Sequence, residues 1–108
     1  MNRRPHLVIT LGDPCGIGPE ILVRSLATLE SWAELSIVGA KAGLDLLDLT
    51  STKAEWAEAA RRLKQSSTWI DPTPDITAHH LILGQGSAAS GRCAVEAVRV
   101  GAQLVMDG

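Results

Sequence analysis

Two glycine-rich turns hold the residues of this sequence whose types and spacing could bind a ligand. The first spans residues 11–20 (LGDPCGIGPE) and lies between an apolar run and a helical pattern. Glycine lets the backbone adopt positive φ and approach a ligand closely, and the free N–H groups at a helix start attract anions such as phosphate. A tight connection from strand to helix is the alternative interpretation, but the flanking Asp13 and Glu20 favour a ligand.

Known phosphate-binding motifs do not fit either turn well. No Gly-Lys-Ser/Thr closes the first turn, and its spacing from Gly12 is G-x-x-x-G-x-G, so it is neither a P-loop nor a dinucleotide fingerprint. The second turn, residues 84–91 (GQGSAASG), formally matches G-x-G-x-x-A. The strand and acid that should follow this motif would lie beyond residue 108. We therefore interpret Ser87 and Ser90 as helix caps.

Other side chains offer little chemistry. His79 and His80 are adjacent, and neighbouring positions of an extended segment point to opposite faces, so they are a poor metal site. Cys15 lies near a helix start, where the pKa of a thiol can fall. No base pairs with it in the sequence, so we do not expect a catalytic cysteine, and two distant cysteines, Cys15 and Cys93, do not form a disulfide framework.

Hydrophobic patterning predicts how the elements position these turns. Short apolar runs, typical of strands buried on both faces, occur at residues 7–11, 35–38 and 81–83. Helical patterns begin at Gly18 and cover residues 40–49, 53–64 and 90–106. This order predicts one α/β unit over residues 1–108, with three layers: a mostly parallel sheet between flanking helices. Ligands of such folds gather beyond the carboxyl ends of the strands, where both turns lie.

The last helical pattern is apolar around most of its circumference. Its polar residues form one narrow stripe: Arg92, Glu96, Arg99, Gln103 and Asp107. Such a helix needs burial on several sides. Either it is the central helix of a tight small domain, or a partner or a further stretch of chain covers part of it.

Composition and charge exclude several classes of function. Ten basic and twelve acidic residues give a formal net charge of −2, without the basic excess of a nucleic-acid-binding protein. Three Trp and no Phe or Tyr make aromatic platforms scarce, so we expect Trp32, Trp56 and Trp69 to be packing residues. No apolar stretch is long enough to span a membrane. The apolar run near the N-terminus is too short for a signal peptide, which predicts a cytoplasmic protein.

Both turns resemble one enzyme family. Residues 5–20 (PHLVITLGDPCGIGPE) resemble the N-terminus of the 4-hydroxythreonine-4-phosphate dehydrogenase family, which typically opens with a strand followed by G-D-P-A-G-I-G-P-E. Residues 84–92 look like that family's G-x-x-S-x-x-S-G-R segment, in the expected order. Cys15 departs from the usual Ala. A shorter version of the first motif opens the related isopropylmalate and isocitrate dehydrogenases.

The resemblance implies an NAD-dependent dehydrogenase that oxidises 4-phosphohydroxy-L-threonine in pyridoxal phosphate biosynthesis. It also implies a divalent metal ion that polarises the substrate oxygens, a homodimer, and the N-terminal part of an isopropylmalate-dehydrogenase-like fold. The family's metal-binding histidines, substrate-phosphate residues and active-site lysine lie beyond the point that matches Gly108. His79 and His80 do not match those histidines, so no catalytic or metal-binding residue is carried over.

The resemblance carries over only the first turn, which lines the cleft near the cofactor. The cofactor-binding candidates are Gly12, Asp13, Gly16, Ile17 and Gly18. We expect the chain to be an incomplete N-terminal portion of a longer dehydrogenase and to have no dehydrogenase activity by itself. Open sheet edges and the apolar last helix predict oligomerisation or marginal solubility.

Two alternatives remain open. The chain could be a small α/β module that binds a phosphate, a nucleotide or a partner protein without catalysis. It could also belong to a paralogue that acts on another phosphorylated hydroxy acid, because the residues that would read the substrate lie outside the resemblance.

Overall fold

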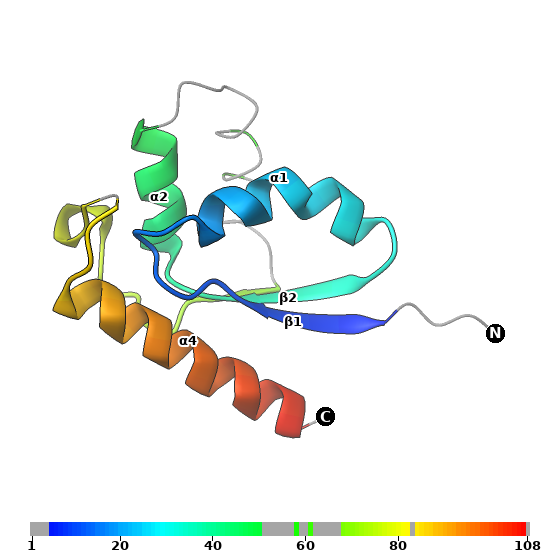
Figure 1. Cartoon of the computed structure of the whole chain (residues 1–108). Coiled ribbons are helices and arrows are strands. Elements are labelled where there is room, and N and C mark those ends of the chain that lie inside the picture. Colours follow the sequence, from blue (N-terminus) through cyan, green and yellow to red (C-terminus); the bar gives the residue numbers. More distant parts are fainter. Residues whose placement is uncertain (1–4, 51–57, 59–60, 62–67, 83, 108) are drawn as a thin grey trace.

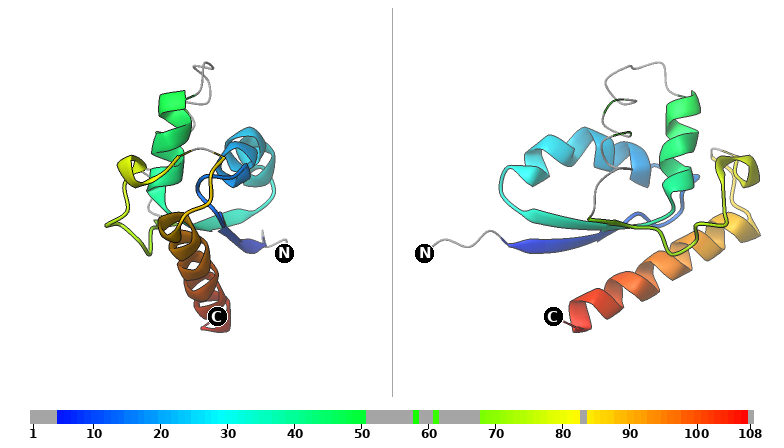
Figure 2. Two further views of the ribbon diagram at one scale, coloured as in Figure 1. Left: turned by 60° about the vertical axis from the view of Figure 1, so that its left-hand side comes forward. Right: turned by 180° about the vertical axis from the view of Figure 1, so that it is seen from behind.

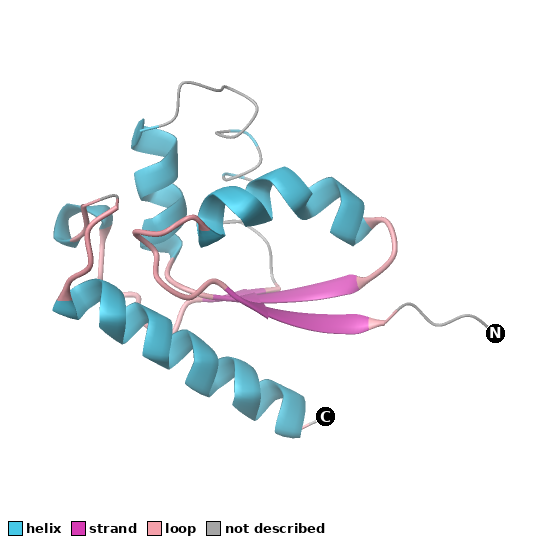
Figure 3. Ribbon diagram, in the orientation of Figure 1, coloured by secondary structure: helices cyan, strands magenta, loops and turns pink. Residues whose placement is uncertain are grey.

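The computed structural model describes residues 5–50, 58, 61, 68–82 and 84–107. Three parallel strands form its sheet in the order β1-β2-β3. Strand β1 (His6–Thr10) pairs with β2 (Glu34–Val38) along its whole length, and β3 (Trp69–Ile70) pairs with the carboxyl end of β2. Figure 3 shows the strands in magenta, with helices on both sides. The expected α/β class with a parallel sheet is confirmed.

The predicted third strand at residues 81–83 is wrong at positions 81 and 82, and position 83 lies outside the described residues. Leu81 follows a short 3-10 helix, η1 (Ala78–His80), and packs in the core. Ile82 forms only an isolated antiparallel bridge with Gln85. The third strand of the sheet is instead β3, whose main chain hydrogen-bonds to the end of β2. Ile37 N–H donates to Thr68 O at 2.9 Å, and the N–H of Gly39, the residue after β2, donates to Ile70 O at 3.0 Å.

Helices cover the two faces of the sheet. Helix α1 (Gly18–Glu30) and α4 (Ala88–Met106) lie on opposite faces, and α2 (Lys41–Thr50) stands at the carboxyl end of the strands (Figures 1 and 2). The predicted helix at residues 53–64, which includes Trp56, falls outside the described residues except at positions 58 and 61. No helix in the described part of the chain is long and apolar enough to cross a membrane.

The buried residues form two clusters. The first fills the space between α1 and the sheet and comprises Leu11, Leu22, Val23, Leu26, Ala33, Leu35, Ile37, Leu44 and Trp69. The second lies where α2, η1 and the start of α4 meet and comprises Cys15, Ala40, Ala42, Leu46, Ile76, Leu81 and Cys93. Trp69 is a packing residue as expected, with its indole N–H donating to Gly39 O at 3.1 Å. Trp32 is not, because 49% of its surface is exposed.

Helix α4 begins at the expected serine caps. Ser87 is the N-cap, and its hydroxyl accepts the Ser90 N–H at 3.1 Å while Ser90 Oγ accepts the Ser87 N–H at 2.9 Å. An ion pair of 2.7 Å between Arg92 and Asp75 joins the first turns of α4 to the loop before η1. The buried face consists only of small residues, Ser90, Cys93, Ala97 and Gly101.

Another side of α4 is apolar but exposed. Its large exposed side chains are Val95, Val98, Val105 and Met106. The residues that the structure describes cover only one side of α4. The interpretation of α4 as the central helix of a tight small domain therefore does not fit the structure.

Candidate functional site

The first glycine-rich turn connects β1 to α1 at the carboxyl edge of the sheet (Figure 1). Gly12 has φ +68°, a left-handed conformation that glycine adopts without steric cost. Asp13 then closes the turn, since its Oδ1 accepts the Cys15 N–H at 2.8 Å and its carbonyl accepts the Gly16 N–H at 3.1 Å. The local sequence thus fixes the path of the chain before the helix begins.

Glycine is also required where the turn meets β1. A Cβ on Gly18 would lie 2.5 Å from the carbonyl oxygen of Leu11, which is too close for any other residue. A Cβ on Gly39 would lie 2.7 Å from the Leu11 side chain. The start of α1 and the end of β2 therefore pack directly against the end of β1. Helix α1 begins at Gly18, where the helical pattern starts, and Glu20 lies in its first turn.

The structure brings the two predicted turns together. Gly84, with φ +79°, donates its N–H to the Cys15 carbonyl at 2.8 Å. This bond joins the turn after β1 to the segment before α4. The formal dinucleotide fingerprint at residues 84–89 lacks its structural context, because an isolated bridge and not a strand of the sheet precedes it.

A cavity of about 230 Å³ lies between these turns and α2. Its lining residues are Pro14, Cys15, Gly16, Ile17, Pro19, Glu20, Gly43 and Gly84. We call it the carboxyl-edge cleft. Of the five candidates carried over from the family, Gly16 and Ile17 line it, whereas Gly12 and Asp13 shape the turn behind it. Gly18 lines a separate apolar cavity of about 280 Å³ between β1 and α1.

The walls of the cleft are mainly apolar. Glu20 supplies its one carboxylate, and no Lys, Arg or His is among its described lining residues. The Ile17 side chain stands at the cleft with 69% of its surface exposed. Burial raises the pKa of the Cys15 thiol, contrary to the lowering that its place near a helix start suggested. The cleft therefore presents apolar surface and a single negative charge.

Sequence reasoning missed several lining residues. Gly43 comes from α2, and a Cβ there would lie 3.0 Å from the Pro14 side chain and 3.1 Å from that of Pro19. No local motif marks this glycine, since its role depends on packing against a distant turn. Gly84 belongs to the second glycine-rich turn, which is visible in the sequence. The sequence does not show that this turn contacts the first one.

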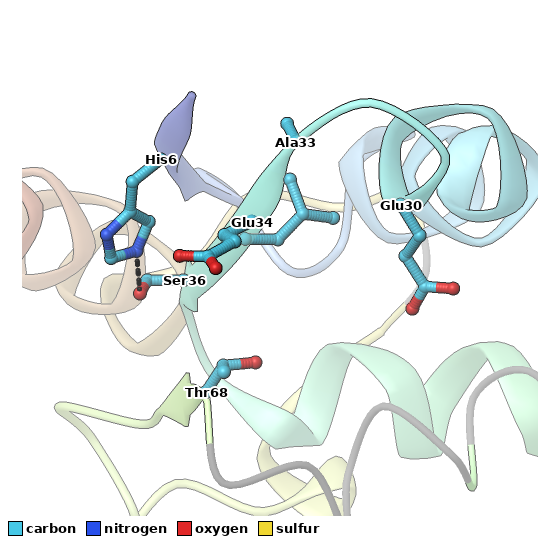
Figure 4. A pocket seen from close by; sticks show the side chains of 7 residues that line it. His6, Glu30, Ala33, Glu34, Ser36 and Thr68 are labelled. Atoms are coloured by element: carbon cyan, nitrogen blue, oxygen red, sulfur yellow. Dashed lines mark hydrogen bonds between the residues drawn. The ribbon is translucent and has the colours of Figure 1, made fainter. Parts of the chain in front are cut away.

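A larger cavity of about 490 Å³ lies at the opposite, amino edge of the sheet (Figure 4). His6 is the first residue of β1, and its Nε2 lies 2.7 Å from Ser36 Oγ on β2. The side chains of His6, Glu30 and Glu34 around this cavity are exposed. None of the cofactor-binding candidates lines this cavity. Although it is larger than the carboxyl-edge cleft, we therefore do not take it as the candidate site.

No metal centre is found in the part of the chain that the structure describes. No three His, Cys, Asp or Glu side chains converge there. His79 and His80 belong to η1, where the Thr77 N–H donates to Nδ1 of His80 at 3.0 Å. His80 therefore helps to cap this short helix.

Comparison with known proteins supports the resemblance found in the turns. A 4-hydroxythreonine-4-phosphate dehydrogenase of Synechococcus sp. (strain JA-2-3B'a(2-13)) is 32% identical over 97% of this chain and 31% of its own length. A protein of the same name from Nostoc sp. (strain PCC 7120) is 39% identical over 82% of this chain and 25% of its own. A protein of Oceanobacillus iheyensis, provisionally named D-threonate 4-phosphate dehydrogenase, is 30% identical over 100% of this chain and 35% of its own.

The chain spans about a third or less of the length of these relatives. No family model matches it, and no solved structure matches it. The similarity to several dehydrogenases nevertheless extends over most of its residues. The chain is thus identified by sequence as a member of the 4-hydroxythreonine-4-phosphate dehydrogenase family, matching the N-terminal part of these proteins.

Proposed function

We propose that this chain is part of an NAD-dependent dehydrogenase that oxidises 4-phosphohydroxy-L-threonine, and that the carboxyl-edge cleft forms part of its cofactor-binding surface. The observation that carries the proposal is the convergence of the two family-like turns on one cleft, where Gly84 N–H meets the Cys15 carbonyl. The carboxyl edge of a parallel sheet is where α/β folds bind their ligands.

The chemistry of the cleft suits a neutral part of the dinucleotide. A phosphate group would meet the Glu20 carboxylate without a cation among the described lining residues. A ribose hydroxyl could instead donate a hydrogen bond to Glu20, while a base or nicotinamide ring packs against Ile17 and Pro14. We therefore propose a nucleoside part of NAD as the occupant, in place of the phosphate that the glycine-rich turn first suggested.

The cleft is small for a whole dinucleotide. Its volume of about 230 Å³ is below the range of about 300–1,000 Å³ that is common for small-molecule sites. One ring with its ribose is a better match. In this proposal the chain's own residues bind and orient the cofactor, and NAD supplies the hydride acceptor.

The described residues do not fit the divalent metal ion that the family implies, because no three ligating side chains converge among them. Residues of a longer polypeptide would have to supply its ligands, as the resemblance implies. A role in pyridoxal phosphate biosynthesis, a cytoplasmic location, a homodimer and an isopropylmalate-dehydrogenase-like fold for the whole enzyme belong to the same proposal.

A second substrate is favoured by one relative. The Oceanobacillus iheyensis protein, whose provisional name specifies D-threonate 4-phosphate, is similar to the whole of this chain. Both substrates are phosphorylated hydroxy acids of similar size. The lining of the cleft does not distinguish them, since it faces the proposed cofactor.

Titration of the 108-residue chain with NAD by calorimetry tests the cleft. Ile17→Ala removes exposed apolar surface at the cleft without touching the core, and we expect it to weaken NAD binding about three- to tenfold. Val105→Ala, a truncation of an equally exposed side chain on α4, is the matched control and should leave the affinity unchanged.

Glu20→Gln separates the two possible occupants of the cleft. If a ribose hydroxyl donates to Glu20, the variant binds NAD more weakly. If phosphates lie there, removal of the negative charge makes NAD and inorganic pyrophosphate bind more tightly. The second outcome, or equal effects of Ile17→Ala and Val105→Ala, would contradict the proposed binding mode.

A further inference from the structure

Both cysteines of the chain lie in the same buried cluster. Cys15 belongs to the turn after β1, and Cys93 belongs to the second turn of α4. Their exposed fractions are 2% and 0%, and neither forms a disulfide in this structure. The sequence separation gave no reason to pair them, but the fold packs both into the second core cluster.

Ser90 is a buried neighbour of Cys93 on α4. It lies one helical turn before Cys93 on the buried face of α4, where residues three positions apart are neighbours. Burial raises the pKa of Cys15, Cys93 adds to this rise, and a hydrogen bond with the Ser90 side chain opposes it. Both cysteines pack in the second core cluster, and the Gly84 N–H holds the Cys15 main chain beside the segment that leads into α4.

The cleft gives a small reagent access to one of the two thiols. Cys15 lines the carboxyl-edge cleft, whereas Cys93 is not among its lining residues and accepts a hydrogen bond of 3.4 Å from the Thr73 hydroxyl. A molecule the size of hydrogen peroxide fits in a cavity of about 230 Å³. The order of reaction follows from this difference in access.

We propose that Cys15 and Cys93 form a reversible intramolecular disulfide when a small hydroperoxide enters the cleft. The Cys15 thiolate attacks hydrogen peroxide and breaks the O–O bond, which gives a sulfenic acid and hydroxide, and the proton lost from the thiol converts the hydroxide to water. The Cys93 sulfur then attacks the Cys15 sulfur and releases a second water. Two thiols thus lose two electrons and two protons, and one peroxide is reduced to two waters.

The disulfide would fix one wall of the cleft to α4. The Gly84 N–H already holds the Cys15 carbonyl beside the segment that leads into this helix, so the new bond adds a covalent tie to an existing contact. A thiol reductant reverses it by exchange. The structure thereby carries a redox-sensitive modification site at the cleft, whether or not the cleft binds NAD.

Intact mass of the 108-residue chain after hydrogen peroxide, with blocking of the remaining thiols, measures the reaction. We expect a loss of about 2 Da, a monomeric product, no thiol left to block, and return to the starting mass with dithiothreitol. Peptide mapping of this wild-type product should show residues 15 and 93 in one disulfide-linked pair. The melting temperature should rise by about 5 °C or more on oxidation.

Cys15→Ala and Cys93→Ala serve as matched variants. Each should keep one thiol, show no loss of 2 Da and show no rise in melting temperature with peroxide. Two outcomes would overturn the proposal: wild-type chains in which each thiol gains oxygen atoms independently, or a disulfide found only between two copies. Because the wild-type peptide map decides between these outcomes, the test stands even if a variant does not fold.

Discussion

Single residues decide the geometry of the carboxyl-edge cleft, and two glycines of the first turn do so for different reasons. Gly12 is required by its backbone conformation, with φ +68° and free space around its Cα. Gly18 is required by close packing against the Leu11 carbonyl. The sequence predicted a glycine-rich turn here. It did not show which glycine is required by its backbone conformation and which by close packing.

Gly18→Ala should therefore lower the free energy of unfolding. Its Cβ would meet the Leu11 carbonyl oxygen at 2.5 Å, and a backbone atom cannot rotate away. We expect a loss of about 2 kcal/mol or more, measured by urea unfolding. Gly16→Ala is the control, because its nearest neighbour would be the Asp13 carbonyl oxygen at 3.4 Å, an ordinary contact. Equal stability of the two variants would contradict this packing.

The oxidation of the cysteines should depend on pH. Burial raises the pKa of both thiols, Asp13 and Asp71 add to the rise, and Arg92 works against it at Cys93. Since the thiolate is the reactive form, its fraction grows with pH and stays small below the raised pKa.

We expect the rate of disulfide formation to increase about tenfold per pH unit from pH 7 to pH 9. Stopped-time mass spectrometry at fixed peroxide concentration measures it. A rate that reaches its plateau below pH 8 would show a lowered thiol pKa and contradict the buried environment.

At the scale of elements, helix α4 is held against the sheet by a small-residue contact. A Cβ on Gly101 would lie 2.6 Å from Cγ2 of Thr10 and 3.6 Å from Cγ1 of Val8. The helix can approach β1 this closely only because position 101 has no side chain. A substitution here should push α4 away from the sheet.

Gly101→Ala and Gly91→Ala form a matched pair on α4. Both replace a helical glycine with the best helix former, a gain of about 1 kcal/mol where nothing interferes. Nothing lies within 4 Å of a Cβ at position 91, so that variant should gain stability. We expect Gly101→Ala to be less stable than Gly91→Ala by about 1–3 kcal/mol in thermal or urea unfolding. The reverse order would show that α4 does not pack on β1 through Gly101.

The sequence predicted most elements correctly but misplaced the third strand. Local periodicity finds apolar runs, and residues 81–83 form a stronger run than Trp69 and Ile70. The position of a strand depends on which main-chain groups reach the edge of β2, and this is a long-range property. Leu81 is buried as expected of an apolar run, but in the second cluster, not in the sheet.

At the scale of the whole molecule, the residues that the structure describes leave an apolar side of α4 uncovered. The exposed side of α4 carries Val95, Val98 and Val105, and contiguous exposed apolar surface favours association. The sequence predicted this excess of apolar residues. It did not show which side of the helix the sheet would cover.

We expect the chain to self-associate through this side of α4. Val98→Lys should raise the monomer fraction in size-exclusion chromatography with light scattering, because a charge cannot be buried there without cost. Gln103→Lys places the same charge on another exposed side of the same helix and should leave the monomer fraction unchanged. A wild-type chain that is monomeric at all concentrations tested would contradict the expectation.

Some residues of the candidate site belong to a local sequence motif, and others come from distant parts of the chain. The first turn was visible as a motif, and two of its residues, Gly16 and Ile17, line the carboxyl-edge cleft. Gly43 and the contact between Cys15 and Gly84 depend on how α2 and α4 pack against that turn. A sequence motif alone cannot place them.

Amide chemical-shift changes on addition of NAD to the 108-residue chain test the proposed cofactor cleft most directly. We predict changes concentrated at Gly16, Ile17, Gly43 and Gly84, which line the cleft. Amides near the amino-edge cavity, such as those of His6 and Ser36, should not change. Changes centred on His6 and Ser36, or no changes at saturating NAD, would contradict a cofactor surface at the carboxyl edge of the sheet.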